Sequence, residues 1–66
     1  MLGPQIKYFR KRQKMTQQQL AERAGLKQVL VSRIERGNRK VTVEELKLIA
    51  SALNVKVSEL LEEQAS

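Results

Sequence analysis

The sequence predicts an all-α domain built from five short helices. Two threonines, Thr16 and Thr42, each stand three residues before a Gln or Glu, which is the spacing of a helix-opening capping box. From Leu46 to Leu53, apolar residues recur at the positions of an amphipathic helix. The strict alternation typical of a strand is missing even from the valine-rich segment 27–34. The 66 residues are expected to form one domain, 1–66.

The helix limits follow from residues that start or stop helices. Pro4 is tolerated in a first turn and opens the first predicted helix. Gly25 and Gly37 suit the left-handed backbone after the second and third helices, and Asn54 suits the same role after the fourth. The fifth helix begins near residue 57, with Ser58 left open as an alternative N-cap. The predicted helices cover residues 4–14, 17–24, 28–36, 43–53 and 57–63.

Composition excludes several classes of chemistry. The chain has no cysteine and no histidine, which excludes disulfides, Cys/His zinc sites, thiol catalysis and histidine acid–base catalysis. Because no nucleophile–base pair or glycine-rich phosphate loop is present, we expect no enzymatic activity, cofactor, metal or small-molecule ligand. No apolar run approaches the roughly 20 residues of a membrane span, and no signal-peptide pattern opens the chain. These observations predict a soluble cytoplasmic protein with no membrane partner.

Charge is distributed unevenly along the chain. The formal net charge is +6, but residues 1–40 hold eleven Lys/Arg and two glutamates, a net of +9. Residues 41–66 hold two lysines and five glutamates, a net of −3. A basic half in a small domain indicates an anionic partner, most often nucleic acid. A solvated lysine-rich surface is the alternative.

The third predicted helix has two chemically different sides. At about 100° per residue, Leu30, Val31 and Ile34 fall on one side and are expected to be buried. The opposite side has no acid, and its groups suit the reading of base edges: amide with adenine, guanidinium with guanine, methyl with thymine. The predicted base-reading residues are Gln28, Val29, Ser32, Arg33 and Arg36.

Two segments beside this helix offer contacts to DNA phosphates. The start of the second helix presents free backbone N–H groups and the positive end of the helix dipole. The loop after Gly37 is short and basic, and Lys27 stands at the start of the third helix. Such contacts supply affinity and register rather than sequence preference. The predicted phosphate-contacting residues are Thr16, Gln17, Lys27, Asn38, Arg39 and Lys40.

Glu35 lies at the edge of the buried side of the third helix. A carboxylate there is costly to bury without a partner. Arg10, one turn beyond Ile6 on the inner edge of the first helix, is the natural candidate, and we predict a structural salt bridge between the two. A solvent-exposed glutamate without a fixed partner is the alternative.

In combination, these residues resemble the helix-turn-helix of phage repressor and Cro type, also called the XRE type. The resemblance runs from Ile6 to about Leu61 and implies a lambda-repressor-like five-helix domain whose third helix reads DNA. It further implies that Gln17 touches the DNA backbone and that Arg10 pairs with Glu35. The residues that carry it are Ile6, Phe9, Arg10, Thr16, Gln17, Leu20, Ala21, Gly25, Leu26, the run 32–37, Leu46, Ile49, Ala50, Leu53 and Leu60.

Three positions depart from the family pattern. Lys14 stands where a glycine is frequent, so its backbone is expected to be strained or its turn altered. Lys27 replaces the usual Ser or Thr N-cap of the third helix, and a lost cap costs about 1 kcal/mol. Val41 stands where a proline is frequent, which loosens the expected path of the loop.

The resemblance predicts a sequence-specific transcription regulator, bacterial or phage-encoded, acting on double-stranded DNA at the nucleoid. A homodimer on a palindromic operator would place two third helices about 34 Å apart, one DNA turn. The acidic C-terminal part is the expected dimer surface, with Leu61 and Val57 as its residues. An alternative is a protein-interaction module of the same fold, such as an antitoxin or a coactivator. Whether the chain is a whole protein or a domain of a larger regulator is left open.

Overall fold

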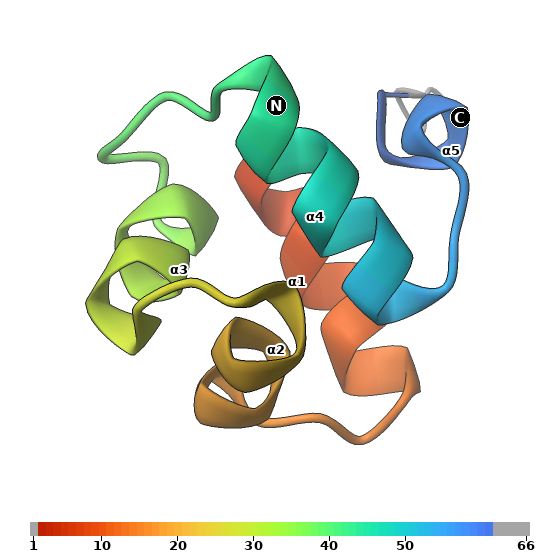
Figure 1. The fold of residues 1–66 in the computed structure, drawn as a ribbon, viewed down its shortest axis with the longest axis horizontal. Helices are drawn as coiled ribbons and strands as arrows, with labels where there is room; N and C mark the ends of the chain where they lie inside the picture. Colours follow the sequence, from red (N-terminus) through yellow and green to blue (C-terminus); the bar gives the residue numbers. More distant parts are fainter. Residues whose placement is uncertain (1, 62–66) are drawn as a thin grey trace.

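The computed structural model describes residues 2–61, and all the regular structure in that range is helical. The prediction of an all-α fold with five helices is therefore confirmed. The helices are α1 (Leu2–Arg12), α2 (Gln17–Ala24), α3 (Gln28–Glu35), α4 (Val43–Leu53) and α5 (Val57–Leu61) (Figure 1).

α1 and α4 form the centre of the arrangement. α1 packs against α3, α4 and α5, while α2 packs against both α3 and α4. In Figure 1, α4 crosses in front of α1, with α2 and α3 on one side of this pair and α5 on the other. α3 therefore has an outer face that no other helix of the described chain covers in this view, and α5 lies well away from it.

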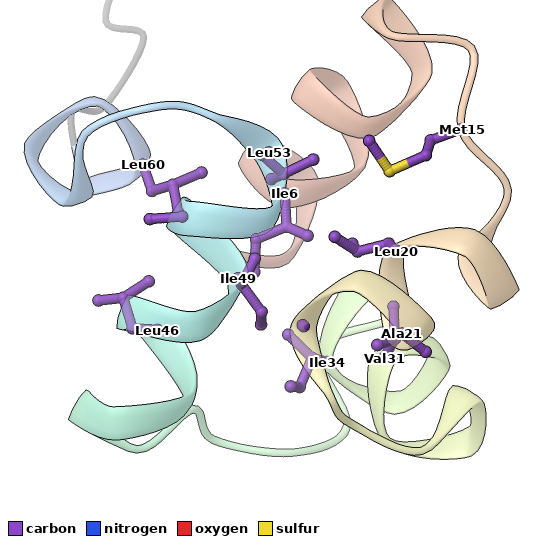
Figure 2. Packing of buried hydrophobic residues seen from close by; sticks show 12 residues of the cluster. Ile6, Met15, Leu20, Ala21, Val31, Ile34, Leu46, Ile49, Leu53 and Leu60 are labelled. Atoms are coloured by element: carbon purple, nitrogen blue, oxygen red, sulfur yellow. The ribbon is translucent and has the colours of Figure 1, made fainter.

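The core is a single cluster to which every helix contributes. Its members meet between α1, α2 and α4, with α3 closing one side and α5 the other (Figure 2). Burying each of its larger side chains (Val, Leu, Ile or Met) is worth about 1.5–3 kcal/mol, and this burial is the main force holding five short helices together. The cluster consists of Ile6, Met15, Leu20, Ala21, Ala24, Val31, Ile34, Leu46, Ile49, Ala50, Leu53 and Leu60.

Both predicted capping boxes are present. The Thr16 hydroxyl oxygen accepts the Gln19 N–H at 3.0 Å, and the Gln19 side-chain oxygen accepts the Thr16 N–H at 2.9 Å. Thr42 and Glu45 make the same two hydrogen bonds, each at 3.1 Å. These bonds satisfy helix-end N–H groups that have no partner within the helix, which is why α2 and α4 begin where the sequence indicates.

The left-handed turns also lie where the sequence places them. Gly25 after α2 has a φ of +72°, and Asn54 after α4 has a φ of +58°. Gly37 has a φ of +77°, but the C-cap of α3 is Arg36, one position before the predicted Gly37. The Gly37 and Asn38 N–H groups donate to the Ile34 and Arg33 carbonyls, as in a Schellman motif.

Three predicted helix limits need correction. α1 covers residues 2–12 rather than 4–14, because its first turn packs beneath α3 and because Lys14, with a φ of +56°, leaves the right-handed region. α3 ends at Glu35, not at residue 36. The predicted start of α5 at residue 57 is confirmed, so the alternative N-cap Ser58 is not used, and the Lys56 N–H donates to the Glu59 carboxylate at 2.8 Å. Residues 62 and 63 of the predicted fifth helix lie outside the described residues.

The contact between α1 and α3 depends on Gly3. A Cβ at this position would lie 2.5 Å from the Ile34 carbonyl oxygen and 2.7 Å from that of Glu35. Both atoms belong to the backbone, so neither can rotate away. Gly3 thus allows the first turn of α1 to touch the last turn of α3, and no pattern in the sequence indicated this requirement.

Candidate nucleic-acid interface

α3 is divided into a buried and an open side. Val31 and Ile34 are fully buried in the core, and Leu30 is half-buried beside them. Hydrophobic burial on this side holds the helix to the domain, while the side chains on the other side are not needed for packing. Of the predicted base-reading residues, four are exposed and one is half-buried: Gln28, Val29, Arg33 and Arg36 are exposed, and Ser32 is half-buried.

The open side combines an apolar group with cations. Val29 leaves 54% of its surface exposed, so an apolar side chain lies among the polar groups of this side. Arg33 lies one turn further along the helix, and the Arg36 Nε donates weakly to the Ser32 carbonyl at 3.4 Å. The only acid of α3, Glu35, is buried on the other side, so no carboxylate of α3 opposes an approaching phosphate.

The Arg10–Glu35 pair lies beneath this surface. Arg10 Nε is 2.6 Å from Glu35 Oε2, and Arg10 Nη2 is 3.0 Å from Glu35 Oε1. Arg10 Nη1 also donates to the Met15 carbonyl at 2.7 Å. The two side chains are only 9% and 2% exposed, so the bidentate geometry compensates two desolvated charges and ties α1 to α3.

Gln17 joins the same network. Its side-chain Nε2 donates to Glu35 Oε1 at 3.0 Å, so the amide is directed toward the carboxylate and is partly buried. Its backbone N–H lies in the first turn of α2 and has no intrahelical acceptor. Glu35 therefore connects the start of α2 with α1 and α3, and it sets the distance between the α2 N-terminus and the open side of α3. Thr16, the preceding residue, is exposed.

Lys27 precedes α3 without acting as a side-chain cap. Its backbone is extended, with φ −79° and ψ 144°, and its side chain makes no capping hydrogen bond. The side chain is exposed at the α3 N-terminus, where the helix dipole is positive. The first N–H groups of α3 thus lack the side-chain acceptor that the capping boxes provide for α2 and α4.

The loop between α3 and α4 places its three polar residues differently. Asn38 and Lys40 are exposed, whereas Arg39 is half-buried and forms a bidentate pair with Glu45 of α4. The hydrogen bond from Arg39 is the largest cause that holds the pKa of the Glu45 carboxyl below its ordinary value. The same bond raises the pKa of Arg39. The sequence indicates only a capping role for Glu45, because a separation of six residues across a loop carries no periodic signal.

A family model described as a helix-turn-helix matches residues 6–60 of this chain. The chain belongs to the helix-turn-helix family. The predicted likeness to the phage repressor and Cro type is confirmed. Members of this family are transcription regulators rather than enzymes.

Relatives and solved structures agree with this assignment. The chain is 38% identical over 63 residues to an immunity repressor protein of Bacillus phage phi105, covering 96% of this chain but 44% of that protein. It is 36% identical over 64 residues to control protein C.SmaI of Serratia marcescens, covering 97% of this chain and 76% of that protein. The N-terminal DNA-binding domain of SinR from Bacillus subtilis superimposes with a TM-score of 0.91 at 33% identity, over 100% of this chain and 97% of that one.

The predicted dimer residues of this helix-turn-helix chain lie on α5. Leu61 is 58% exposed, while Val57 is half-buried against the core. Leu60 is fully buried and belongs to the core. Leu61 is therefore the residue of the three with most surface to offer another molecule.

Two negative findings hold for residues 2–61 of the helix-turn-helix chain. No three His, Cys, Asp or Glu side chains in that range gather as metal ligands would. None of its helices has both the length and the apolar character needed to cross a bilayer.

Proposed function

We propose that this domain is a sequence-specific transcription regulator that inserts α3 into the major groove of double-stranded DNA, in a bacterial or phage-infected cytoplasm. The observation that carries the proposal is the acid-free open side of α3, whose polar and methyl groups project from a helix held by buried residues. Base edges in the major groove present donor, acceptor and methyl patterns that such groups can distinguish. The names of the relatives, an immunity repressor and a control protein, point the same way.

Specific roles follow from side-chain chemistry. Arg33 can donate bidentately to a guanine, and Gln28 can bond the edge of an adenine. Val29 can contact a thymine methyl group, because its side chain is exposed on the same side of α3 as Gln28 and Arg33. Ser32 and Arg36 complete the base-reading set.

Phosphate contacts come from the edges of α3. We propose that Gln17 binds a phosphate through its backbone N–H, since its amide is directed toward Glu35. Thr16 stands beside it, and the exposed side chains of Lys27, Asn38 and Lys40 extend the basic border. The sequence also predicts Arg39 as a phosphate contact, but its guanidinium is paired with Glu45.

A homodimer on a palindromic operator completes the proposal. One α3 touches only a few base pairs, each worth about 1–3 kcal/mol of discrimination, so two copies raise specificity. The exposed Leu61, with Val57 beside it, is the proposed contact between copies. Half-sites are then expected one DNA turn apart, about 34 Å.

The proposal is tested by selecting bound sequences from a random duplex pool. The wild-type protein should enrich a palindrome, and binding should weaken steeply with salt because phosphate contacts release counterions. Gln28→Ala and Arg33→Ala should change the enriched bases, whereas Lys40→Ala should weaken all duplexes alike. No enrichment, or equal losses from all three variants, would contradict the role of α3 as the reader. If the domain were instead a protein-interaction module, Arg33→Ala would leave partner binding largely intact.

A further inference from the structure

We propose that Arg39 is a positioning residue: with Glu45 it clamps the α3–α4 loop, so that Asn38 and Lys40, and not Arg39 itself, meet the DNA backbone. The inference rests on the proposed DNA-binding function and replaces the role that the sequence suggested for Arg39. It concerns residues 37–42, which connect α3 to the capping box of α4.

The Arg39 guanidinium is hydrogen-bonded to acceptors within the protein. Its Nη1 is 2.7 Å from Glu45 Oε1, and its Nη2 is 3.1 Å from Glu45 Oε2. Nη1 also donates to the Lys40 carbonyl at 2.9 Å. Both carboxylate oxygens are thus engaged by a planar fork, the arrangement in which arginine binds a carboxylate most strongly.

Glu45 is held from a second direction. Its Oε1 also accepts the Thr42 N–H at 3.1 Å, so one carboxylate closes the α4 capping box and receives the loop arginine. The carboxyl's lowered pKa is the expected consequence of these donors. A DNA phosphate reaching for Arg39 would have to compete with this carboxylate and approach its negative charge.

Little else supports the loop from the α1 side. An open cavity of about 370 Å³ separates it from the first turn of α1, with Leu2 and Pro4 on one wall and Lys40 and Val41 on the other. Val41 packs against the core at the end of the loop, but the exposed Lys40 before it has no such packing. The position of Lys40 therefore depends on Val41, on the turn at Gly37 and on the Arg39–Glu45 clamp. The clamp therefore helps set where the exposed Lys40 side chain lies, while the Schellman turn holds the neighbouring Asn38.

Arg39→Lys separates a clamp from a phosphate contact. Lysine is a point charge that serves a phosphate well but cannot reproduce a bidentate fork. We expect Arg39→Lys and Arg39→Ala to weaken binding to a selected duplex by a similar factor, about fivefold, through loss of loop order. If Arg39→Lys binds like the wild type while Arg39→Ala does not, Arg39 is a phosphate contact and the inference is overturned.

The glutamate side supplies a matched pair of variants. Glu45→Gln and Glu44→Gln each remove one negative charge from the first turn of α4, and the glutamine at 45 keeps an oxygen for the Thr42 N–H. Glu45→Gln should bind the duplex more weakly than Glu44→Gln, although both gain the same electrostatic attraction. In Arg39→Ala/Glu45→Gln, the second change should add no further loss, because the clamp is already broken. Tighter binding by Glu45→Gln than by Glu44→Gln would show a released Arg39 on phosphate.

The salt dependence of binding gives an independent measure. The slope of log K against log salt is negative, and losing one phosphate contact makes it shallower by about 0.9. Lys40→Ala should show that decrease, whereas Glu45→Gln, which removes no cation, should weaken binding through the loop alone. A slope for Glu45→Gln steeper than that of Glu44→Gln would mean that Arg39 has gained a phosphate, and would count against the clamp.

One readout needs no DNA. Amide hydrogen exchange across residues 38–42 should accelerate in Arg39→Ala and Arg39→Lys but not in Lys40→Ala, and the Glu45 carboxyl should titrate nearer its ordinary pKa in both Arg39 variants. If these changes occur while the wild type binds no duplex, the proposed function fails and the clamp stands. If the wild type binds its duplex but exchange is unchanged in the variants, the clamp fails and the function stands.

Discussion

Two arginine–glutamate pairs in this domain are both bidentate but lie in different surroundings. Arg10 with Glu35 and Arg39 with Glu45 are both bidentate, with donor–acceptor distances between 2.6 and 3.1 Å. Each arginine also donates to a backbone carbonyl, that of Met15 or of Lys40. Yet the first pair's side chains are 9% and 2% exposed, and the second pair's are 36% and 16% exposed.

The difference shows that geometry alone does not set the consequence of a salt bridge. Breaking the buried pair leaves an uncompensated charge inside the protein, between α1, α2 and α3. Breaking the outer pair leaves groups that water can solvate, so folding changes little and only the loop loses its position. Breaking the buried pair lowers the stability of the domain, whereas breaking the outer pair changes where a loop lies.

The largest expected effect is at the buried pair. Arg10→Ala should lower the free energy of unfolding by about 3–5 kcal/mol, because Glu35 loses its compensating charge and the Met15 carbonyl its donor. Urea unfolding followed by far-ultraviolet circular dichroism measures the change. Arg39→Ala is the matched control and should unfold near the wild-type midpoint; equal shifts in the two variants would remove the distinction between the pairs. Arg10→Met/Glu35→Leu should lose less stability than Arg10→Ala alone.

Gly3→Ala tests the same region through its backbone contact. The added Cβ would lie 2.5 Å from the Ile34 carbonyl oxygen, so α1 must move away from α3. Overpacking of this kind costs about 1–3 kcal/mol, which a thermal unfolding curve would detect. Pro4→Ala, at the exposed neighbouring position, is the control. If Gly3→Ala is as stable as Pro4→Ala, the two helices are not held as closely as the contact implies.

Lys14→Gly should stabilise the turn that presents the Met15 carbonyl to Arg10. Lys14 has a φ of +56°, a left-handed conformation that costs an L-residue about 1–2 kcal/mol and a glycine almost nothing. Part of this gain is offset by the greater freedom of glycine in the unfolded chain, so we expect a net gain of about 0.5–1 kcal/mol. Lys11→Gly, within α1, is the control and should destabilise. Loss of stability in both variants would show that the turn is not strained.

The smallest expected effect is the pH dependence of the outer pair. Because the pKa of Glu45 is lowered in the folded protein, its contribution is present above the unfolded value, about 4.3, and is lost as pH falls through the folded value. Comparing wild type with Glu45→Gln isolates this group from the other carboxylates. The stability difference should be small at neutral pH and disappear in acid; a difference that grows on acidification would contradict the sign.

The sequence predicted most of the fold because helix signals are local. The Thr16 and Thr42 capping boxes, the turns at Gly25 and Asn54, and the division of α3 into two sides can all be read from neighbouring residues. The start of α1 could not be read in this way. It depends on Gly3 meeting the α3 backbone about thirty residues away, and such a contact leaves no periodic pattern.

The candidate site was predictable to a similar extent. Periodicity identifies which α3 residues face outward, and the cost of burying a lone charge predicts that Glu35 pairs with Arg10. What the sequence could not show is how side chains share partners. Gln17 is directed to Glu35, and Arg39 to Glu45, although all that the sequence reveals of either residue is a polar group near a helix end.

The two-sided character of α3 has a consequence for redesign. Gln28, Val29 and Arg33 contribute little to the core, so exchanging them should cost within about 0.5 kcal/mol of stability, as surface substitutions generally do. Glu35, on the opposite side of the same helix, holds three helices together and must be left unchanged. A library that varies only the outward positions would therefore search target preference in proteins that remain folded, and the domain could serve as a scaffold for new operators.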